Sequence, residues 1–96
     1  MIDNDSIYCL LYGKIMKKEK KYSDAKKYFE KSMNLGNDEA IYELGKLHFQ
    51  DIIESDDNNE KAIKYFKMSI DKGNFKAMFY YGRLLIKKEK SKEEGI

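Results

Sequence analysis

The stretch that decides the fold is SMNLGNDEAIYELGKLHF at residues 32–49, because it returns 37 positions later as SIDKGNFKAMFYYGRLLI at residues 69–86. Nine apolar, small or asparagine residues keep the same offset when the comparison is extended upstream. The nine in the first copy are Ala25, Tyr28, Phe29, Ser32, Gly36, Asn37, Ala40, Gly45 and Leu47. Self-similarity at one fixed period predicts a repeat protein, in which each unit packs against its neighbours.

An earlier partial copy precedes these two units. Gly13 and Lys14 match Gly45 and Lys46, but at an offset of 32 positions instead of 37. The difference of five residues indicates an insertion in the second unit. It falls where acidic residues gather, namely Asp51, Glu54, Asp56, Asp57 and Glu60. The sequence therefore predicts an acidic loop between two helices of this unit, without the ligand spacing and central glycine of a calcium loop.

Each unit has the apolar spacing of two helices. Ala25, Tyr28, Phe29 and Ser32 lie at i, i+3, i+4 and i+7, which places them on one stripe of a helix, and we expect this stripe to form the core. With no proline in the chain, the glycines are the main punctuation. The pattern predicts helices at about 5–18, 22–35, 37–50, 58–72 and 74–90.

Glycines and asparagines mark the expected turns. Gly36 and Gly73 stand where a helix ends on a residue with a positive backbone φ angle, and Asn37 and Asn74 follow as N-caps of the next helix. Asp57 and Glu60 have the spacing of a capping box.

These features predict an all-α fold, a right-handed α-α superhelix (solenoid) of about two and a half helix-turn-helix repeats. We expect one domain over residues 1–96, with repeats at about 5–36, 37–73 and a partial repeat at 74–96. Tyr8 stands where the later copies have Ala40 and Ala77, so the first repeat is expected to open the solenoid. Residues 91–96 resemble the start of a further second helix, which suggests a piece of a longer array.

Composition argues against several classes of protein. The formal net charge of +2 gives no global field that would attract nucleic acid or anionic lipid. Cys9 is the only cysteine, which excludes an intramolecular disulfide. No apolar run approaches the roughly 18 residues that a membrane span needs, and the opening residues are acidic where a signal peptide is basic. We expect a soluble, cytoplasmic protein.

Catalytic and metal-binding groups are scarce. Nucleophilic catalysis needs a nucleophile beside an oriented base, yet the sole histidine, His48, and the sole thiol, Cys9, fall on different predicted helices. Two such residues cannot supply the four ligands of a structural zinc site. His48 is expected to be packed and hydrogen-bonded, and Cys9 to be a small buried residue. We expect no enzyme activity, no metal and no cofactor.

The repeat strings resemble the Sel-one-like subclass of tetratricopeptide-like repeats from Tyr8 to Ile96. They carry the subclass's small residue, then glycine four positions later, alanine four after that and glycine five further, although Ser32 and Ser69 replace the usual alanine. The resemblance implies an adaptor or scaffold that binds a partner protein or peptide. Because solenoids present a concave face built by the first helix of each pair, we expect binding there.

A cationic residue directly follows each of the three repeated glycines, namely Lys14, Lys46 and Arg83. We expect these three side chains to line one side of the concave face. Tyr42 and Phe79 lie three residues before the same glycines, about one helical turn away, and would add apolar anchors. The candidate peptide-binding residues are Lys14, Tyr42, Lys46, Lys76, Phe79 and Arg83. Such a groove suits an acidic segment or a chain-terminal carboxylate.

Two further predictions concern other partners. Nucleic-acid binding through the lysine-rich segment 14–31, with Tyr22 among the lysines, is the alternative function, although neither nucleic acid nor membrane is the expected partner. The apolar side of the last helix, near Tyr81, Leu84 and Leu85, is expected to lack its normal cover, so self-association through the solenoid ends should follow.

Overall fold

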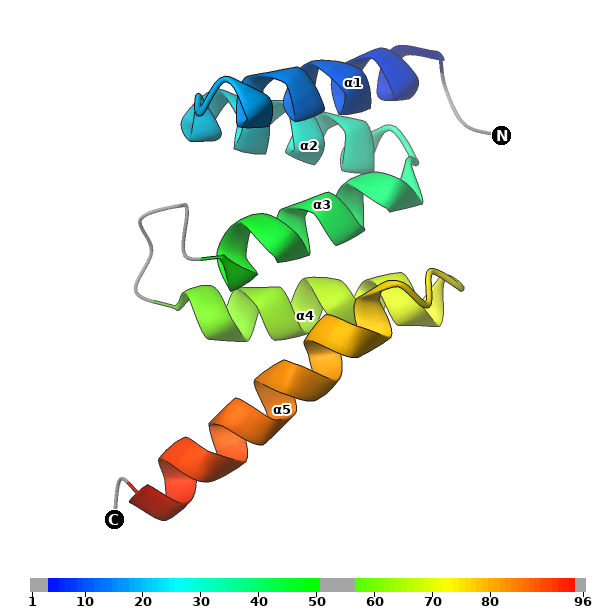
Figure 1. Ribbon diagram of the computed structural model, residues 1–96. Helices are drawn as coiled ribbons and strands as arrows, with labels where there is room; N and C mark the ends of the chain where they lie inside the picture. The colour runs from blue at the N-terminus through cyan, green and yellow to red at the C-terminus, as the bar shows by residue number, and fades with distance from the viewer. Residues whose placement is uncertain (1–3, 51–56, 95–96) are drawn as a thin grey trace.

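Five α-helices follow one another in a computed structural model of the chain, which describes residues 4–50 and 57–94, with side chains as far as Lys90 (Figure 1). They are α1 (Asn4–Lys18), α2 (Tyr22–Asn34), α3 (Asp38–Phe49), α4 (Asn58–Asp71) and α5 (Ala77–Glu94). No strand occurs in the described part of the chain. The all-α prediction is confirmed, and every helix begins and ends within about four residues of its predicted limits.

The helices stack in chain order as an α-α solenoid. The extensive contacts join α1 to α2, α2 to α3, α3 to α4 and α4 to α5, so each helix packs against its neighbours in the sequence. Figure 1 shows α5 crossing α4 obliquely, with its second half extending away from the stack. The longest dimension, 48 Å, is nearly three times the shortest, 17 Å. This arrangement leaves long helix surfaces available at both ends.

Three of the turns use the same hydrogen-bonded helix ending. Gly36 and Gly73 have φ angles of +98° and +92°, as predicted. After each glycine the asparagine N–H donates to a carbonyl five residues back, at 3.1 Å for Asn37 to Ser32 and 2.8 Å for Asn74 to Ser69. The turn after α1 has the same pattern, with Lys20 at a φ of +64°. A lysine at this position does not indicate a positive φ angle, so the sequence did not predict this turn geometry.

The core has two parts, each centred on a phenylalanine of a second helix. Phe29 and Phe66 are completely buried, with Ala25 and Leu44 in the first part and Ala62, Ala77 and Leu84 in the second. A Cβ atom built on Gly13 would lie 2.5 Å from the Phe29 ring, and one on Gly45 would lie 2.7 Å from the Phe66 ring. These distances are shorter than real Cβ contacts, so glycine is what lets each ring reach the helix backbone.

Two local predictions are wrong. Tyr28 does not belong to the core stripe, because its side chain lies on the flank of α2, 37% exposed, with its ring centroid 5.7 Å from that of Tyr12. The capping box is not formed, because the Asp57 side chain makes no cap hydrogen bond and pairs with Lys61 at 3.5 Å.

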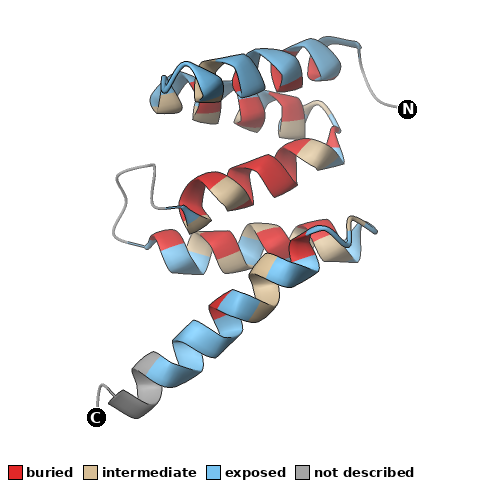
Figure 2. Cartoon of the chain, viewed as in Figure 1, coloured by how far each residue is buried: buried red, intermediate tan, exposed pale blue. Residues whose placement is uncertain are grey.

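Both ends of the stack expose apolar side chains, but not all of those predicted. Leu84 is buried against α4, which corrects its assignment to the uncovered side of α5. The exposed apolar residues of α5 are Met78, Phe79, Leu85 and Ile86, and those of α1 are Ile7, Tyr8, Leu11, Tyr12 and Ile15. Figure 2 shows the contrast between the red central helix α3 and the largely pale blue α5.

Two sequence-based interpretations concern residues outside the described part of the chain. The acidic stretch falls mostly at positions 51–56, and the similarity to a further second helix falls at 91–96, where side chains are not described.

Candidate functional site

Charged side chains from two repeats surround Tyr42 on α3. The Tyr42 ring is nearly buried, and the ammonium groups of Lys46 and Lys76 each lie 4.9 Å from its centroid. A cation over an aromatic face is attracted by the electron density of the ring. Together with the carboxylates of Glu39 and Glu43, these three residues are here named the Tyr42 cluster.

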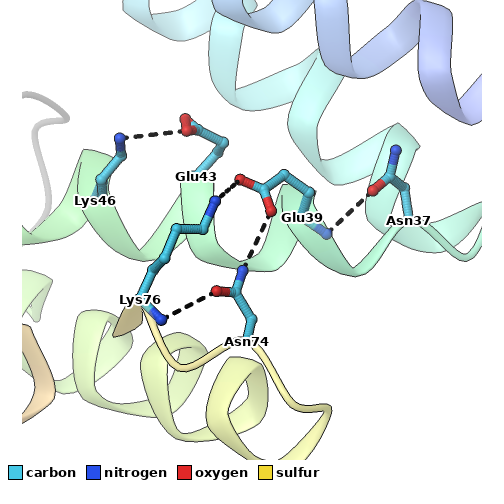
Figure 3. Close-up of polar contacts among 6 residues, drawn as sticks. All are labelled: Asn37, Glu39, Glu43, Lys46, Asn74 and Lys76. Carbon is cyan, nitrogen blue, oxygen red and sulfur yellow. Dashed lines mark hydrogen bonds and ion pairs between the residues drawn. The ribbon is translucent and has the colours of Figure 1, made fainter. Parts of the chain in front are cut away.

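The two carboxylates were not predicted as part of the site. Glu43 lies 3.3 Å from Lys46, and its side chain is only 7% exposed. Glu39 accepts a hydrogen bond of 2.7 Å from the Lys76 ammonium and one of 3.2 Å from the Asn74 amide (Figure 3). Glu39 and Lys76 occupy equivalent positions in successive repeats, and this equivalence was the sequence signal that could have indicated their pairing. The cluster is therefore a network of both charges instead of a wall of cations.

Burial widens the pH range over which Tyr42 is neutral. It raises the pKa of the Tyr42 phenol to about 12, and the neighbouring Tyr80, then Glu43 and Glu39, act in the same direction. The phenol therefore carries no charge near neutral pH. The two lysines rest on a neutral ring that packs against Tyr80, with 6.0 Å between centroids.

The cation that α1 brings near this cluster is Lys17. Burial lowers the pKa of the Lys17 ammonium, the Lys46 charge lowers it further, and Glu43 opposes the change. The predicted residue, Lys14, is exposed on α1, and within the described residues it makes no ion pair or ring contact. Lys17 matches Phe49 at the repeat offset, so the repeat pattern gave no reason to choose a cation there.

Phe79 and Arg83 form a separate pair on α5. The Arg83 guanidinium carbon lies 5.4 Å from the Phe79 ring centroid, and both side chains are exposed. The structure therefore brings together Tyr42, Lys46 and Lys76 from the predicted set. Phe79 and Arg83 lie on the next first helix, and Lys14 stands apart.

A family model described as the Sel1 repeat matches residues 5–37 and again 38–74, which covers α1 to α4. The chain belongs to the Sel1 repeat family. Sel1 repeats are a non-catalytic type of helical scaffold and generally mediate protein–protein interaction. Comparison with curated proteins found no match, and comparison with solved structures found none either.

His48 and Cys9 have structural surroundings in this Sel1 repeat chain. His48 is fully buried, its Nδ1 donates to the Asn58 side-chain oxygen at 2.7 Å, and its ring stacks on Tyr65. Cys9 is buried in α1. Both predictions for these residues are confirmed. Among the described residues, no three His, Cys, Asp or Glu side chains are grouped so that they could hold a metal ion.

The lysine-rich segment 14–31 spans the end of α1, the turn and most of α2. Tyr22, expected to stand among the lysines as a stacking ring, is half-buried and packs against the core around Phe29. Because its ring packs inward, Tyr22 is not available for stacking on a base, and the exposed tyrosine of this segment is instead Tyr28, which packs beside Tyr12. None of the helices described has both the length and the apolar character needed to cross a bilayer.

Proposed function

We propose that this Sel1 repeat chain binds a partner protein through its first helices, α1, α3 and α5, and that the bound segment is acidic or ends in a carboxylate. The contact residues are Lys14, Tyr42, Lys46, Lys76, Phe79 and Arg83, together with Lys17. The observation that carries the proposal is the approach of Lys46 and Lys76 to one tyrosine ring from two different repeats.

The charge balance of this surface favours an acidic ligand. In the Tyr42 cluster two lysines stand against the carboxylates of Glu39 and Glu43, and the additional positive charge of the proposed contact residues comes from Lys14, Lys17 and Arg83. Burial, and then the charge of Lys46, lower the pKa of Lys17, so an incoming carboxylate would relieve the repulsion between these two lysines as well as form new bonds.

The Lys76–Glu39 pair is an exchangeable contact. The Lys76 side chain is 60% exposed, and exposed ion pairs contribute about 1 kcal/mol or less. A ligand carboxylate could therefore replace Glu39 on the Lys76 ammonium at little cost. Arg83 could hold a second carboxylate by two parallel hydrogen bonds, while the exposed Phe79 ring supplies apolar contact.

Titration of fluorescent acidic and basic peptides against paired variants tests the proposal. The test variant carries Lys14→Glu, Lys46→Gln and Arg83→Glu. Glutamine is used at position 46 because glutamate would face the buried Glu43 carboxylate. The control carries Lys27→Glu, Lys31→Gln and Lys67→Glu, which changes the net charge equally at exposed positions of α2 and α4.

We expect the acidic peptide to bind the wild type and the control, and to bind the test variant at least about tenfold more weakly. Equal binding of both peptides, or equal loss in both variants, would contradict the proposal. The titration is repeated with a single-stranded oligonucleotide over a series of salt concentrations. This distinguishes nucleic-acid binding from peptide binding, because affinity for phosphates falls steeply with salt.

Two finer expectations stay predictions. Self-association through the solenoid ends is tested by light scattering over a concentration series, and the cytoplasmic location by imaging of a tagged chain.

A further inference from the structure

Gly82 on α5 occupies the repeat position of Gly13 and Gly45, but no ring in the described part of the chain packs on it. A Cβ atom built on Gly82 would meet no described heavy atom within 4 Å. The same construction on the other two glycines meets a buried phenylalanine ring at 2.5 and 2.7 Å. A glycine inside a helix costs about 0.5–1 kcal/mol relative to alanine, and at Gly13 and Gly45 the close ring accounts for it. At Gly82 no described contact does.

The residues around Gly82 also reproduce a ring-binding site. On α3, Gly45 lies between Tyr42 and Phe49, and the Phe66 ring centroid is 6.2 Å from each of these two rings. The residues 37 positions later are Phe79 and Ile86, and each is 63% exposed. Two apolar side chains therefore stand on either side of a bare glycine, in the arrangement that holds Phe66 one repeat earlier.

Other residues on the same side of α5 are also more exposed than their counterparts on α3. On α3, Ile41 and His48 are 2% and 0% exposed, and Asn58 and Tyr65 of α4 contact His48. Their counterparts Met78 and Leu85 are 55% and 43% exposed. By contrast, Ala77 and Leu84 on the opposite side of α5 are buried against α4. The four exposed apolar residues lie on the side that would receive a second helix, and most of α5 is pale blue in Figure 2.

We propose that this side of α5, formed by Met78, Phe79, Gly82, Leu85 and Ile86, is a docking site for an amphipathic helix of a partner protein. The helix lies antiparallel to α5, as α2 lies on α1 and α4 on α3, and it places an aromatic ring on Gly82.

The two covered glycines specify the chemistry of this helix. In both α2 and α4 the ring residue has an alanine four positions before it and a serine three positions after it, as in Ala62, Phe66 and Ser69. All three are completely buried, so small residues on both sides of the ring let the helices approach closely. The partner helix should therefore read small, three residues, aromatic, two residues, small, along one face.

The helix dipole bears on the ends of the partner helix. In an antiparallel pair its first turn lies beside the second half of α5, where Lys87 and Lys88 line a hollow against α4 with Leu84 and do not face this site. Acidic residues in that first turn would be favoured by the helix dipole. The site shares Phe79 with the surface proposed for acidic ligands, but it does not depend on the charges of the Tyr42 cluster.

A peptide with the α4 sequence, NNEKAIKYFKMSID, is the probe, and its binding to the 96-residue chain is followed by amide chemical shifts in nuclear magnetic resonance. A matched peptide carries the Phe66→Ala change. The probe has three lysines against two acidic residues, so its binding does not report on an acidic-ligand site. We expect saturable shifts centred on Gly82 and Ile86 with the first peptide, and at least about tenfold weaker binding of the second.

Two protein variants locate the site. Gly82→Leu fills the position that the aromatic ring would occupy, where a Cβ atom meets no described atom within 4 Å, and should weaken binding at least about tenfold. Lys27→Leu adds the same side chain at an exposed position of α2 and should leave binding unchanged.

Three outcomes would overturn the proposal. The first is equal binding of the two peptides, and the second is shifts centred on the exposed residues of α1. The third is a shift of the Gly82 amide that follows protein concentration without peptide, which would make a second copy of the chain the occupant.

Discussion

The α3 surface around Gly45 and the α5 surface around Gly82 have similar residues but opposite surroundings. Gly45 lies under the Phe66 ring, whereas a Cβ atom built on Gly82 would meet no described heavy atom within 4 Å. Tyr42 is 7% exposed, and its counterpart Phe79 is 63% exposed. The difference shows that burial in a solenoid depends on which helix comes next, and that a motif suited to a core can equally well be a binding surface.

The largest effect is expected when the Phe66 ring that covers Gly45 is removed. Phe66→Ala should lower the free energy of unfolding by about 3–5 kcal/mol, because it leaves a cavity against Gly45 and between Tyr42 and Phe49. Urea unfolding followed by circular dichroism measures the change. The matched variant Phe79→Ala removes an exposed ring and should stay within about 0.5 kcal/mol of the wild type. Similar losses in both variants would contradict the difference in burial.

A single methyl group should have opposite effects on the two glycines. Gly45→Ala places a Cβ atom 2.7 Å from the buried Phe66 ring and should cost about 1–3 kcal/mol. Gly82→Ala meets nothing described within 4 Å and should stabilise α5 by up to about 1 kcal/mol, the helix propensity difference. Thermal unfolding of the two variants side by side checks the signs. Destabilisation by Gly82→Ala would mean that this glycine already has a packing role.

The turn between α4 and α5 should be more sensitive than the turn after α1. Gly73→Val puts a β-branched residue at a φ of +92° and should cost about 1–2 kcal/mol. Lys20 already occupies the corresponding conformation at +64°, so Lys20→Gly should be neutral or mildly stabilising. Chemical denaturation of both variants measures the pair. A tolerated valine at position 73 would show that the glycine is not needed for the turn.

The serines distinguish the two covered repeats from each other. The Ser32 hydroxyl donates to the Ser6 carbonyl at 2.6 Å, whereas the buried Ser69 hydroxyl has no hydrogen-bond partner in the described part of the chain. Ser32→Ala should therefore cost about 1 kcal/mol, and Ser69→Ala should be neutral or stabilising by a similar amount. Differential scanning calorimetry reads both. Equal costs would indicate that the Ser69 hydroxyl is satisfied in solution.

The last expected effect is confined to alkaline pH and concerns the ionisation of Tyr42. Because its pKa is raised from 10.0 to about 12 in the folded protein, the unfolded chain loses this proton first as the pH rises. The stabilising contribution is complete below about pH 10 and lost towards pH 12, and Tyr42→Phe should flatten that part of the stability profile. The control Phe79→Tyr adds a phenol at an exposed position and should leave the slope unchanged. An unchanged profile in Tyr42→Phe would contradict the prediction.

The sequence by itself determined the repeat, the five helices and the positive φ angles of Gly36 and Gly73. It also predicted the packing of His48 and Cys9. These features follow from local rules, because helical spacing, glycine conformations and internal offsets can all be read from neighbouring positions.

Only the tertiary structure decided which side chains share a surface. It exposed Tyr28, buried Leu84 and put Lys17 near Lys46 in place of Lys14. It also paired Glu39 with Lys76, residues that stand 37 positions apart in the sequence. The physical reason is that the packing of whole helix faces sets the rotation of each helix about its axis and the angle at which it crosses its neighbour. In addition, a long side chain can reach a different partner by a change of its conformation.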